Sequence, residues 1–380
     1  MRPTFKLALP AQQFLTEYWQ KKPLVMRQVA SGLDHPDADT LSGLSLESDV
    51  DSRLITGHGD GPWNLQHGPF DENDFRVLPR ENWTLLVQSV DCFLTEVSML
   101  LDHFSFLPAW RLEDIMISYA SRGGSVGPHF DRYDVFLMQA KGQRRWKIGD
   151  HCNPHTPLQE NDQLKLINNM KVRDEYVLSP GDVLYLPPGV AHWGIAEDSD
   201  CITWSVGFRA PSPVDILGRL ADQAAESGGD TLFTDPDRTV PSDAASLQPA
   251  DIEALTRQAF RALTPDIQRR ALAELLSEPS CPSGLDFDVD HDHIAAASPD
   301  ALLVRHGATR LILDDQGDAW LNGNHWPLTE AAKPLIRLLA GQRLYTEAEL
   351  QPVTHDDGQD LLDEWIEAGY FAYLDFSTDE

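Results

Sequence analysis

The sequence predicts a protein that is mainly β with α, built around a β-sandwich or barrel and carrying helical parts after it. Three observations support this fold class. Between about residues 110 and 210, short apolar runs are interrupted by Gly and Pro, as in closely spaced antiparallel strands. From 214 to 277, spaced Leu, Ile and Ala indicate helices. After about residue 283, strand and helix patterns are mixed, which indicates a separate small domain.

The length of 380 residues predicts two or three domains. We place them at 1–212, 213–282 and 283–380. Hydrophobic residues make up 42% of the chain and aromatic residues 9%, so the composition is that of an ordinary globular protein. The acidic run 286–293, at the start of the third domain, is typical of a solvated linker.

Within the first domain, an apolar face formed by Phe14, Tyr18 and Trp19 predicts a helix over 11–20. Apolar runs between turn residues then predict a series of strands. These are 115–121, 133–140, 144–149, 183–186 and 201–208. In the second domain the periodicity predicts helices over 214–227 and 251–277. In the third it predicts strands at 301–304, 309–313, 319–321 and 370–374, and helices at 334–340 and 358–368.

The charge balance excludes one large class of partner. The chain has 60 acidic and 30 basic residues, a net charge of −30, and such a surface repels nucleic-acid phosphates. Residues 281–380 contain 5 basic and 20 acidic residues, a net charge of −15. This excess opposes a reading of the third domain as a DNA-binding winged helix in a regulator. We therefore expect no direct nucleic-acid binding.

The chain shows no targeting pattern. Its N-terminal residues lack the apolar core and cleavage site of a signal peptide, and no run of 18 apolar residues predicts a membrane span. The four cysteines are far apart and contain no Cys-x-x-Cys motif. They are Cys92, Cys152, Cys201 and Cys281. We expect a cytoplasmic protein with reduced thiols and without a structural zinc site or disulfide framework.

The strand-rich block contains a candidate metal site. His129 and Asp131 follow a Gly/Pro turn and lie two residues apart, so on a strand their side chains point to the same side. His192 follows a second Gly/Pro turn about sixty residues later. Two histidines and one carboxylate that leave open positions on a metal are typical of non-haem Fe(II) oxygenases. The competing interpretation treats each histidine as structural. His291 and His293, among aspartates, fit a solvated linker better.

A predicted inward-facing arginine indicates an anion inside the same block. Alternation places Arg144 on one face with Trp146 and Ile148, and these apolar neighbours mark that face as buried. A buried guanidinium requires a negative partner. That partner is either an internal carboxylate, for which Asp134 or Asp182 would serve, or the carboxylate of a substrate or cofactor.

Other polar side chains share predicted inward faces. In the strand 201–208, alternation separates Thr203 and Ser205 from an apolar face, and Ser118 has a similar place on an earlier strand. These hydroxyls would line a polar pocket. Tyr133 shares a face with Asp131, which makes it our candidate for contact with a substrate, while a core aromatic is the alternative.

Several of these segments together resemble a known family, the JmjC-type ribosomal oxygenases, and in particular the bacterial enzymes that hydroxylate an arginine of large-subunit ribosomal protein sixteen. The segments that carry the resemblance are 116–135, 142–146, 180–189 and 205–211. The resemblance extends to 14–26 and 47–54 and continues more loosely through the helical and C-terminal parts. The resemblance implies a double-stranded β-helix, the JmjC or cupin-like jelly roll. It also implies that the protein uses Fe(II), 2-oxoglutarate and O2.

The resemblance further assigns residues and partners. The implied iron ligands are His129, Asp131 and His192. Arg144 would bind the distal carboxylate of 2-oxoglutarate, with Ser118 and Thr203 assisting. Residues 213–282 would be a dimerisation region that makes a homodimer, and 283–380 a winged-helix-like domain.

The predicted function is hydroxylation of an arginine side chain, at the 3-position, in a protein of the large ribosomal subunit. Two alternatives remain open. One is the same chemistry on a ribosomal histidine or another protein target. The other is a cupin-like metal-binding or sugar-binding module without catalysis, against which the inward Arg144 argues.

Overall fold

The computed structural model describes residues 2–59, 61–153, 155–159, 164–227, 231–241, 243–281 and 301–374. It divides into two compact units. The first unit comprises Met1–Ala210, Pro279–Thr309 and Thr329–Glu380, and the second comprises Pro211–Glu278 and Arg310–Leu328. The second unit therefore combines most of the predicted helical domain with a short strand-forming segment of the predicted third domain. The predicted acidic linker lies outside the described residues.

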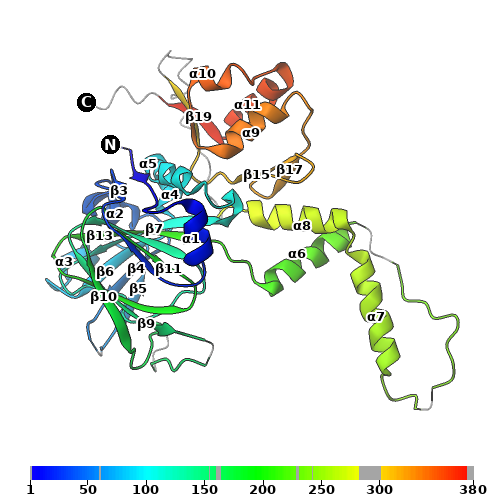
Figure 1. The fold of residues 1–380 in the computed structure, drawn as a ribbon, viewed down its shortest axis with the longest axis horizontal. Coiled ribbons are helices and arrows are strands. Elements are labelled where there is room, and N and C mark those ends of the chain that lie inside the picture. The colour runs from blue at the N-terminus through cyan, green and yellow to red at the C-terminus, as the bar shows by residue number, and fades with distance from the viewer. Residues whose placement is uncertain are drawn as a thin grey trace. The chain divides into compact units, whose positions relative to one another are not determined.

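The first unit is built on two antiparallel sheets that face each other (Figure 1). The larger sheet has the strand order β2-β11-β8-β13-β7-β6-β4-β5. Its strands are β2 (Leu24–Met26), β4 (Ser52–Thr56), β5 (Asn64–His67), β6 (Trp83–Val87), β7 (Leu112–Ala120), β8 (Val135–Lys141), β11 (Val183–Leu186) and β13 (Cys201–Phe208). The smaller sheet has the order β10-β9-β12, from β9 (Arg144–His151), β10 (Val172–Leu178) and β12 (Val190–Ala196).

Apolar side chains from both sheets meet between them and hold the layers together. Leu137 of β8 and Leu184 of β11 pack in one cluster with Trp146 and Ile148 of β9. The predicted alternation in β9 is confirmed, because Arg144, Trp146 and Ile148 are buried and the residues between them are partly exposed. The predicted barrel is therefore confirmed as a cupin-like double-layered β-structure.

A second core covers the outer face of the larger sheet. In β13, which lies between β7 and β8, Ile202, Trp204 and Val206 contribute to this core. Phe14 of α1 (Ala11–Glu17) is fully buried against it, with its ring centroid 5.6 Å from that of Phe136 and 5.0 Å from that of Tyr185. The predicted N-terminal helix thus covers the sheet. The other elements before β7 are β1 (Thr4–Phe5), β3 (Ala30–Ser31), α2 (Ala38–Leu44), α3 (Glu72–Arg76), α4 (Val90–Phe93), α5 (Thr95–Ser98), η1 (Met99–Phe104) and η2 (Ala109–Arg111).

Within the strand-rich block, β10 and β12 are not among the predicted runs, and neither are the strands before β7. The first four residues of β10 are exposed and three of them are charged, as the place of β10 at the edge of the smaller sheet allows, so the strand lacks an apolar pattern. In β12 the alternation is interrupted by Gly194, where an added Cβ atom would lie 2.7 Å from the indole ring of Trp146. Glycine is required there because the tryptophan packs directly on the backbone.

The helices and strands predicted after residue 213 agree closely with observed elements, while the strands at Asn324–Trp326 and Leu344–Tyr345 and the helix at Glu347–Leu350 were not predicted. In the second unit, the predicted helix over 251–277 is two helices, because Thr264 caps a new helix that begins at Pro265. This unit contains α6 (Pro213–Glu226), α7 (Pro249–Ala262), α8 (Pro265–Ser277), β15 (Leu311–Leu313), β16 (Ala319–Leu321) and β17 (Asn324–Trp326). The C-terminal part of the first unit contains β14 (Leu302–Arg305), α9 (Lys333–Gly341), β18 (Leu344–Tyr345), α10 (Glu347–Leu350), α11 (Asp356–Glu367) and β19 (Phe371–Leu374). In the part of the chain that the structure describes, no helix is long and apolar enough to cross a membrane.

The cysteine prediction is wrong for one pair. Cys92, in α4, forms a disulfide with Cys281, and their Cα atoms are 6.2 Å apart. The pairing joins positions 189 residues apart in the chain, so no local spacing motif could indicate it. Cys152 and Cys201 are free and buried, as expected for reduced thiols.

The disulfide predicts a measurable loss of stability when it is removed. Cys92→Ser should lower the free energy of unfolding by about 2–4 kcal/mol, because the crosslink restricts the unfolded chain. Urea denaturation measures this change. Alkylation of the denatured protein should modify two of the four cysteines before reduction and all four after it. Four reactive thiols in the unreduced protein would contradict the pairing.

Candidate active site

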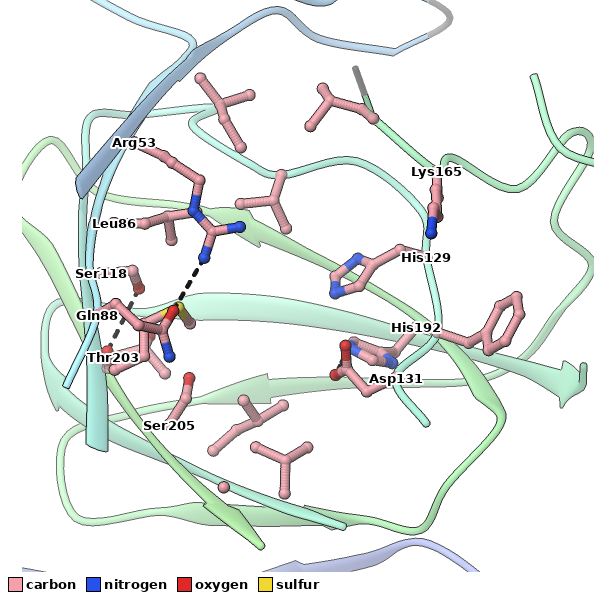
Figure 2. A pocket seen from close by; sticks show the side chains of 18 of the residues that line it. Arg53, Leu86, Gln88, Ser118, His129, Asp131, Lys165, His192, Thr203 and Ser205 are labelled. Carbon is pink, nitrogen blue, oxygen red and sulfur yellow. Dashed lines mark hydrogen bonds and ion pairs between the residues drawn. The ribbon is translucent and has the colours of Figure 1, made fainter. Parts of the chain in front are cut away.

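A pocket of about 440 Å³ lies between the two sheets of the first unit. Its lining residues come from both layers and include Arg144 and His192 from the smaller sheet. Figure 2 shows two groups of polar side chains on opposite sides of this space. His129, Asp131 and His192 lie on one side, and a group that includes Ser118, Thr203 and Ser205 lies on the other.

The two histidines are brought together by their own main chain. His129 and His192 form an isolated antiparallel bridge, with N–O distances of 3.0 and 2.8 Å. Asp131 follows two residues later, and its carbonyl oxygen accepts a hydrogen bond of 2.7 Å from Gly189 N. His129 and Asp131 were predicted on a strand, but β8 begins only at Val135, and a bridge followed by a loop places the pair instead.

Both Gly/Pro turns are necessary for this arrangement. Gly127 and Gly189 have φ angles of +78° and +81°, values that favour glycine. An added Cβ atom would lie 2.7 Å from Leu166 at the first position and 2.7 Å from His151 at the second. The turns therefore allow the two histidine-bearing segments to meet at the pocket.

The side chains of the triad are oriented for a metal ion. The Nδ1 atoms of His129 and His192 each lie 2.9 Å from a carbonyl oxygen two residues earlier, so the Nε2 atoms are left for coordination. His192 Nε2 is 3.5 Å from Asp131 Oδ2, and one ligand atom from each of the three residues lies within 4.8 Å of the others. Burial, with His129 beside it, lowers the pKa of His192 to about 4, so this imidazole is neutral near pH 7. Two imidazoles and a carboxylate fit a divalent transition-metal ion that keeps open positions.

Arg144 has no internal carboxylate partner among the described residues. It is 3% exposed and lines the pocket, and its Nε and Nη2 atoms are buried without a hydrogen-bond partner there. Asp134 pairs instead with Arg111 at 3.1 Å, and Asp182 pairs with Arg27 at 2.6 Å. Neither of the two internal partners suggested by the sequence therefore pairs with Arg144. A buried, unsatisfied guanidinium in a pocket is suited to a bound carboxylate.

The predicted hydroxyl residues line the pocket as well. Ser118 and Thr203 are register partners on β7 and β13, and Ser118 Oγ donates to the Thr203 carbonyl oxygen at 3.3 Å (Figure 2). The Thr203 hydroxyl donates to Gln139 Oε1 at 3.1 Å. Tyr133 lines the pocket from the loop before β8 and is 44% exposed. Partial burial raises its pKa, and Asp131 and Asp114 add to the effect.

Three lining residues were missed by sequence reasoning. Asp114 is 7% exposed on β7, where positions 114, 116 and 118 share one face. Extending the alternation back from Ser118 would have found it. Gln88 and Arg53 line the same pocket, and no pattern in the sequence marks them.

A second cluster of candidate ligands lies in the second unit but is already satisfied. Asp314, Asp318 and His325 have ligand atoms within 4.8 Å of one another. However, Asp314 accepts hydrogen bonds from Arg269 and from the Trp320 indole, and Asp318 accepts one from the Leu328 backbone. This cluster is an ion-pair network within its own unit.

Comparison with known proteins connects this geometry to a family. A JmjC-domain model matches residues 99–216, and an AraC-like ligand-binding-domain model matches 172–278. The chain is 34% identical over 355 residues to the ribosomal protein uL16 3-hydroxylase of Escherichia coli, covering 88% of this chain and 92% of that protein. The chain belongs to the JmjC-type ribosomal oxygenases.

Other relatives of this oxygenase support the same assignment. It is 43% identical over 211 residues to a probable ribosomal oxygenase of Haemophilus influenzae, covering 55% of this chain and 52% of that one. A crystal structure of E. coli YcfD matches with a TM-score of 0.84 and 30% identity, covering 98% of this chain and all of that chain. A structure of YcfD with cobalt and 2-oxoglutarate matches with a TM-score of 0.80 and 30% identity, covering 97% and 99% of the two chains. The predicted family, fold class and enzyme class are confirmed.

The triad geometry predicts a single metal site that depends on His192. His192→Ala should weaken Mn²⁺ or Co²⁺ binding by more than about a hundredfold, because one of three protein ligands is lost. Isothermal titration calorimetry measures the affinity. The matched control is His325→Ala, a substitution in the second cluster that should leave the affinity for the metal ion unchanged. Loss of binding in the control but not in His192→Ala would place the metal elsewhere.

Proposed function

We propose that this oxygenase uses Fe(II), 2-oxoglutarate and O2 to hydroxylate an arginine of ribosomal protein uL16 at the 3-position. The observation that carries the proposal is one pocket that combines a metal-binding triad, an unsatisfied arginine and a further carboxylate. The E. coli relative, a uL16 3-hydroxylase, supports the substrate, and the cobalt and 2-oxoglutarate complex of YcfD supports the cofactors.

The residues of the pocket have separate tasks. His129, Asp131 and His192 would hold Fe(II), and Arg144 would bind the distal carboxylate of 2-oxoglutarate near Ser118 and Thr203. When bound, the metal and 2-oxoglutarate supply the oxidising power that inserts one oxygen atom of O2 into a C–H bond, with release of succinate and carbon dioxide. The protein orients the substrate, fixes the three ligands and limits access of water.

Two residues suit the cationic side chain of the substrate. Asp114 offers a carboxylate inside the pocket, and Tyr133 offers an aromatic ring at a more exposed position. A guanidinium binds carboxylates through paired hydrogen bonds and stacks on aromatic faces. Asp134, which the sequence suggested as an acidic neighbour, has a side chain that is 0% exposed and is occupied by Arg111 and Tyr185. Asp114 takes that place.

The residues of the pocket also favour an arginine hydroxylase over the two alternative functions. A histidine target does not need a second carboxylate beside the metal triad, whereas an arginine target does. A metal-binding or sugar-binding module without catalysis does not need the buried Arg144, whose burial without an anion is costly.

We also infer a homodimer that forms through the helices of residues 213–282. Apolar side chains at helical spacing are exposed on two of these helices, with Val214 77% and Leu217 56% exposed on α6, and Ile252 50% and Leu255 46% exposed on α7. An unpartnered apolar face of this kind fits a second copy of the chain. The winged-helix-like character of residues 283–380 remains a prediction.

The surface charge suits the proposed partner and compartment. Ribosomal proteins bind RNA and are basic, so a net charge of −30 favours encounter with such a substrate and opposes contact with RNA itself. A cytoplasmic location follows from the ribosomal substrate. The alternative explanation of the negative charge is adaptation to a salty cytoplasm. Measuring the KM for the peptide at increasing salt concentration distinguishes the two explanations, because electrostatic steering of the substrate weakens as ionic strength rises.

The substrate assignment predicts a specific product. A uL16 peptide incubated with the protein, Fe(II) and 2-oxoglutarate in air should gain the mass of one oxygen atom, located on an arginine by fragmentation mass spectrometry. The control peptide carries lysine at that arginine and should remain unmodified. An oxygen atom on histidine would support the alternative target, and no oxygen on either residue would overturn the substrate assignment.

The role of Arg144 predicts a selective effect on one substrate. Arg144→Met should raise the KM for 2-oxoglutarate by about tenfold or more, since a charge-assisted pair is lost, and should change the KM for the peptide by less than about twofold. Succinate formation measures both constants. The matched control is Arg145→Met, because Arg145 pairs with Glu175 and Glu197 and does not line the pocket. Equal KM values for 2-oxoglutarate in the two variants would contradict the role of Arg144.

A further inference from the structure

Three polar residues form a chain across one end of the pocket. Arg53 lies on β4, Asp114 lies on β7, and Gln88 follows β6, the strand between them in the sheet. All three line the pocket. Arg53 and Gln88 lie on the side opposite the metal triad in Figure 2.

The side chain of Gln88 connects the other two residues. Arg53 Nη2 donates a hydrogen bond of 2.9 Å to Gln88 Oε1, and Gln88 Nε2 donates one of 2.5 Å to Asp114 Oδ2 (Figure 2 shows the first). The amide therefore presents its oxygen to the cation and its nitrogen to the anion, and both ends are satisfied. Either reversal of the amide or its removal would break both contacts.

The main chain next to Gln88 is fixed against the same strand. Ser89 donates to Asp114 Oδ2 from its backbone nitrogen at 3.2 Å and from its hydroxyl at 3.1 Å. Asp91 Oδ1 accepts a bond of 2.8 Å from the backbone nitrogen of Ile115. The segment that carries Gln88 is thus anchored at Asp114 and at Ile115, which makes the position of its amide well defined.

Arg53 is a potential competitor for Asp114. Its Nε atom is buried without a hydrogen-bond partner, and in the described part of the chain it forms no ion pair with a carboxylate. The hydrogen bond to the neutral Gln88 amide is what holds its guanidinium. Arginine and aspartate readily form a bidentate ion pair, and such a pair would use the same carboxylate that a substrate guanidinium requires.

We propose that Gln88 is a positioning residue for arginine recognition, which keeps Arg53 and Asp114 apart so that Asp114 is presented to the substrate guanidinium. This inference rests on the proposed function, because it takes a guanidinium as the group that Asp114 binds. Specificity is obtained here by preventing an internal pair that would otherwise occupy the binding group.

The test is a double-substitution cycle of Gln88→Met and Arg53→Met. Methionine has nearly the length of glutamine and matches the aliphatic part of arginine, but it removes the hydrogen bonds of both side chains and, in Arg53→Met, also the charge. Gln88→Met should raise the KM for the uL16 peptide by about tenfold and change kcat and the KM for 2-oxoglutarate by less than about twofold. The double variant should regain most of the lost peptide affinity, because the competing cation is gone. Arg53→Met alone should stay within about twofold of the unsubstituted protein.

A second arm does not depend on the ribosomal sequence. The four proteins are the unsubstituted protein, the two single variants and the double variant. Their affinities for N-acetylarginine amide are measured by NMR titration with Mn²⁺ and 2-oxoglutarate in the absence of oxygen, and should fall in the same order as their affinities for the peptide. Thermal unfolding of each variant checks the fold, and Gln88→Ala replaces Gln88→Met if the latter does not fold.

The outcomes distinguish failure of the proposed function from failure of the proposed role of Gln88. If the unsubstituted protein does not modify the peptide, the proposed function fails, and the N-acetylarginine amide arm alone then decides the role of Gln88. If the peptide is modified but Arg53→Met does not rescue Gln88→Met in either arm, Gln88 has no positioning role. Equal loss of peptide and 2-oxoglutarate affinity in Gln88→Met would also overturn the inference, because it would indicate a general structural defect.

Discussion

The main-chain bridge between His129 and His192 is the contact on which the site depends. It joins a loop that leads out of a glycine turn to strand β12 and brings two imidazoles to within 4.2 Å between ring centroids. The backbone hydrogen bonds fix where the side chains begin, and each Nδ1 contact with a carbonyl oxygen fixes which nitrogen faces the pocket. Because both glycine turns have to adopt positive φ angles for the bridge to form, the proposed metal site depends on turn chemistry as much as on the identity of its ligands.

Charge placement inside the pocket then determines what the site can bind. Arg144 is buried and has no carboxylate partner among the described residues, so its partner would arrive with the cofactor. Such a group is costly in the empty protein and favourable in the complex, because binding supplies the missing partner. The carboxylate of Asp114 lies at the pocket wall, where it is held by hydrogen bonds from Gln88 and Ser89. In our proposal Gln88 has a related role, because its neutral amide binds Arg53 and prevents an ion pair between Arg53 and Asp114.

Local periodicity was sufficient to predict much of this arrangement. The alternation in β9 correctly placed Arg144 on the buried face with Trp146 and Ile148. The alternation in β13 correctly separated Thr203 and Ser205 from the apolar face. Features that depend on contacts distant in sequence were not predictable in this way. Asp114 was overlooked although it shares the face of Ser118, and the chain from Arg53 to Gln88 exists only because β4, β6 and β7 are neighbours in the sheet. The Cys92–Cys281 disulfide joins residues far apart in the sequence, so it also could not be predicted from local patterns.

The central claim is that one pocket couples oxidation of 2-oxoglutarate to hydroxylation of an arginine. The most direct measurement is turnover of the uL16 peptide under ¹⁸O₂ with succinate quantified in the same reaction. The account predicts one succinate per hydroxylated peptide, with the heavy oxygen atom on the arginine. Succinate that forms without a labelled arginine, or a label that appears on another residue, would contradict it.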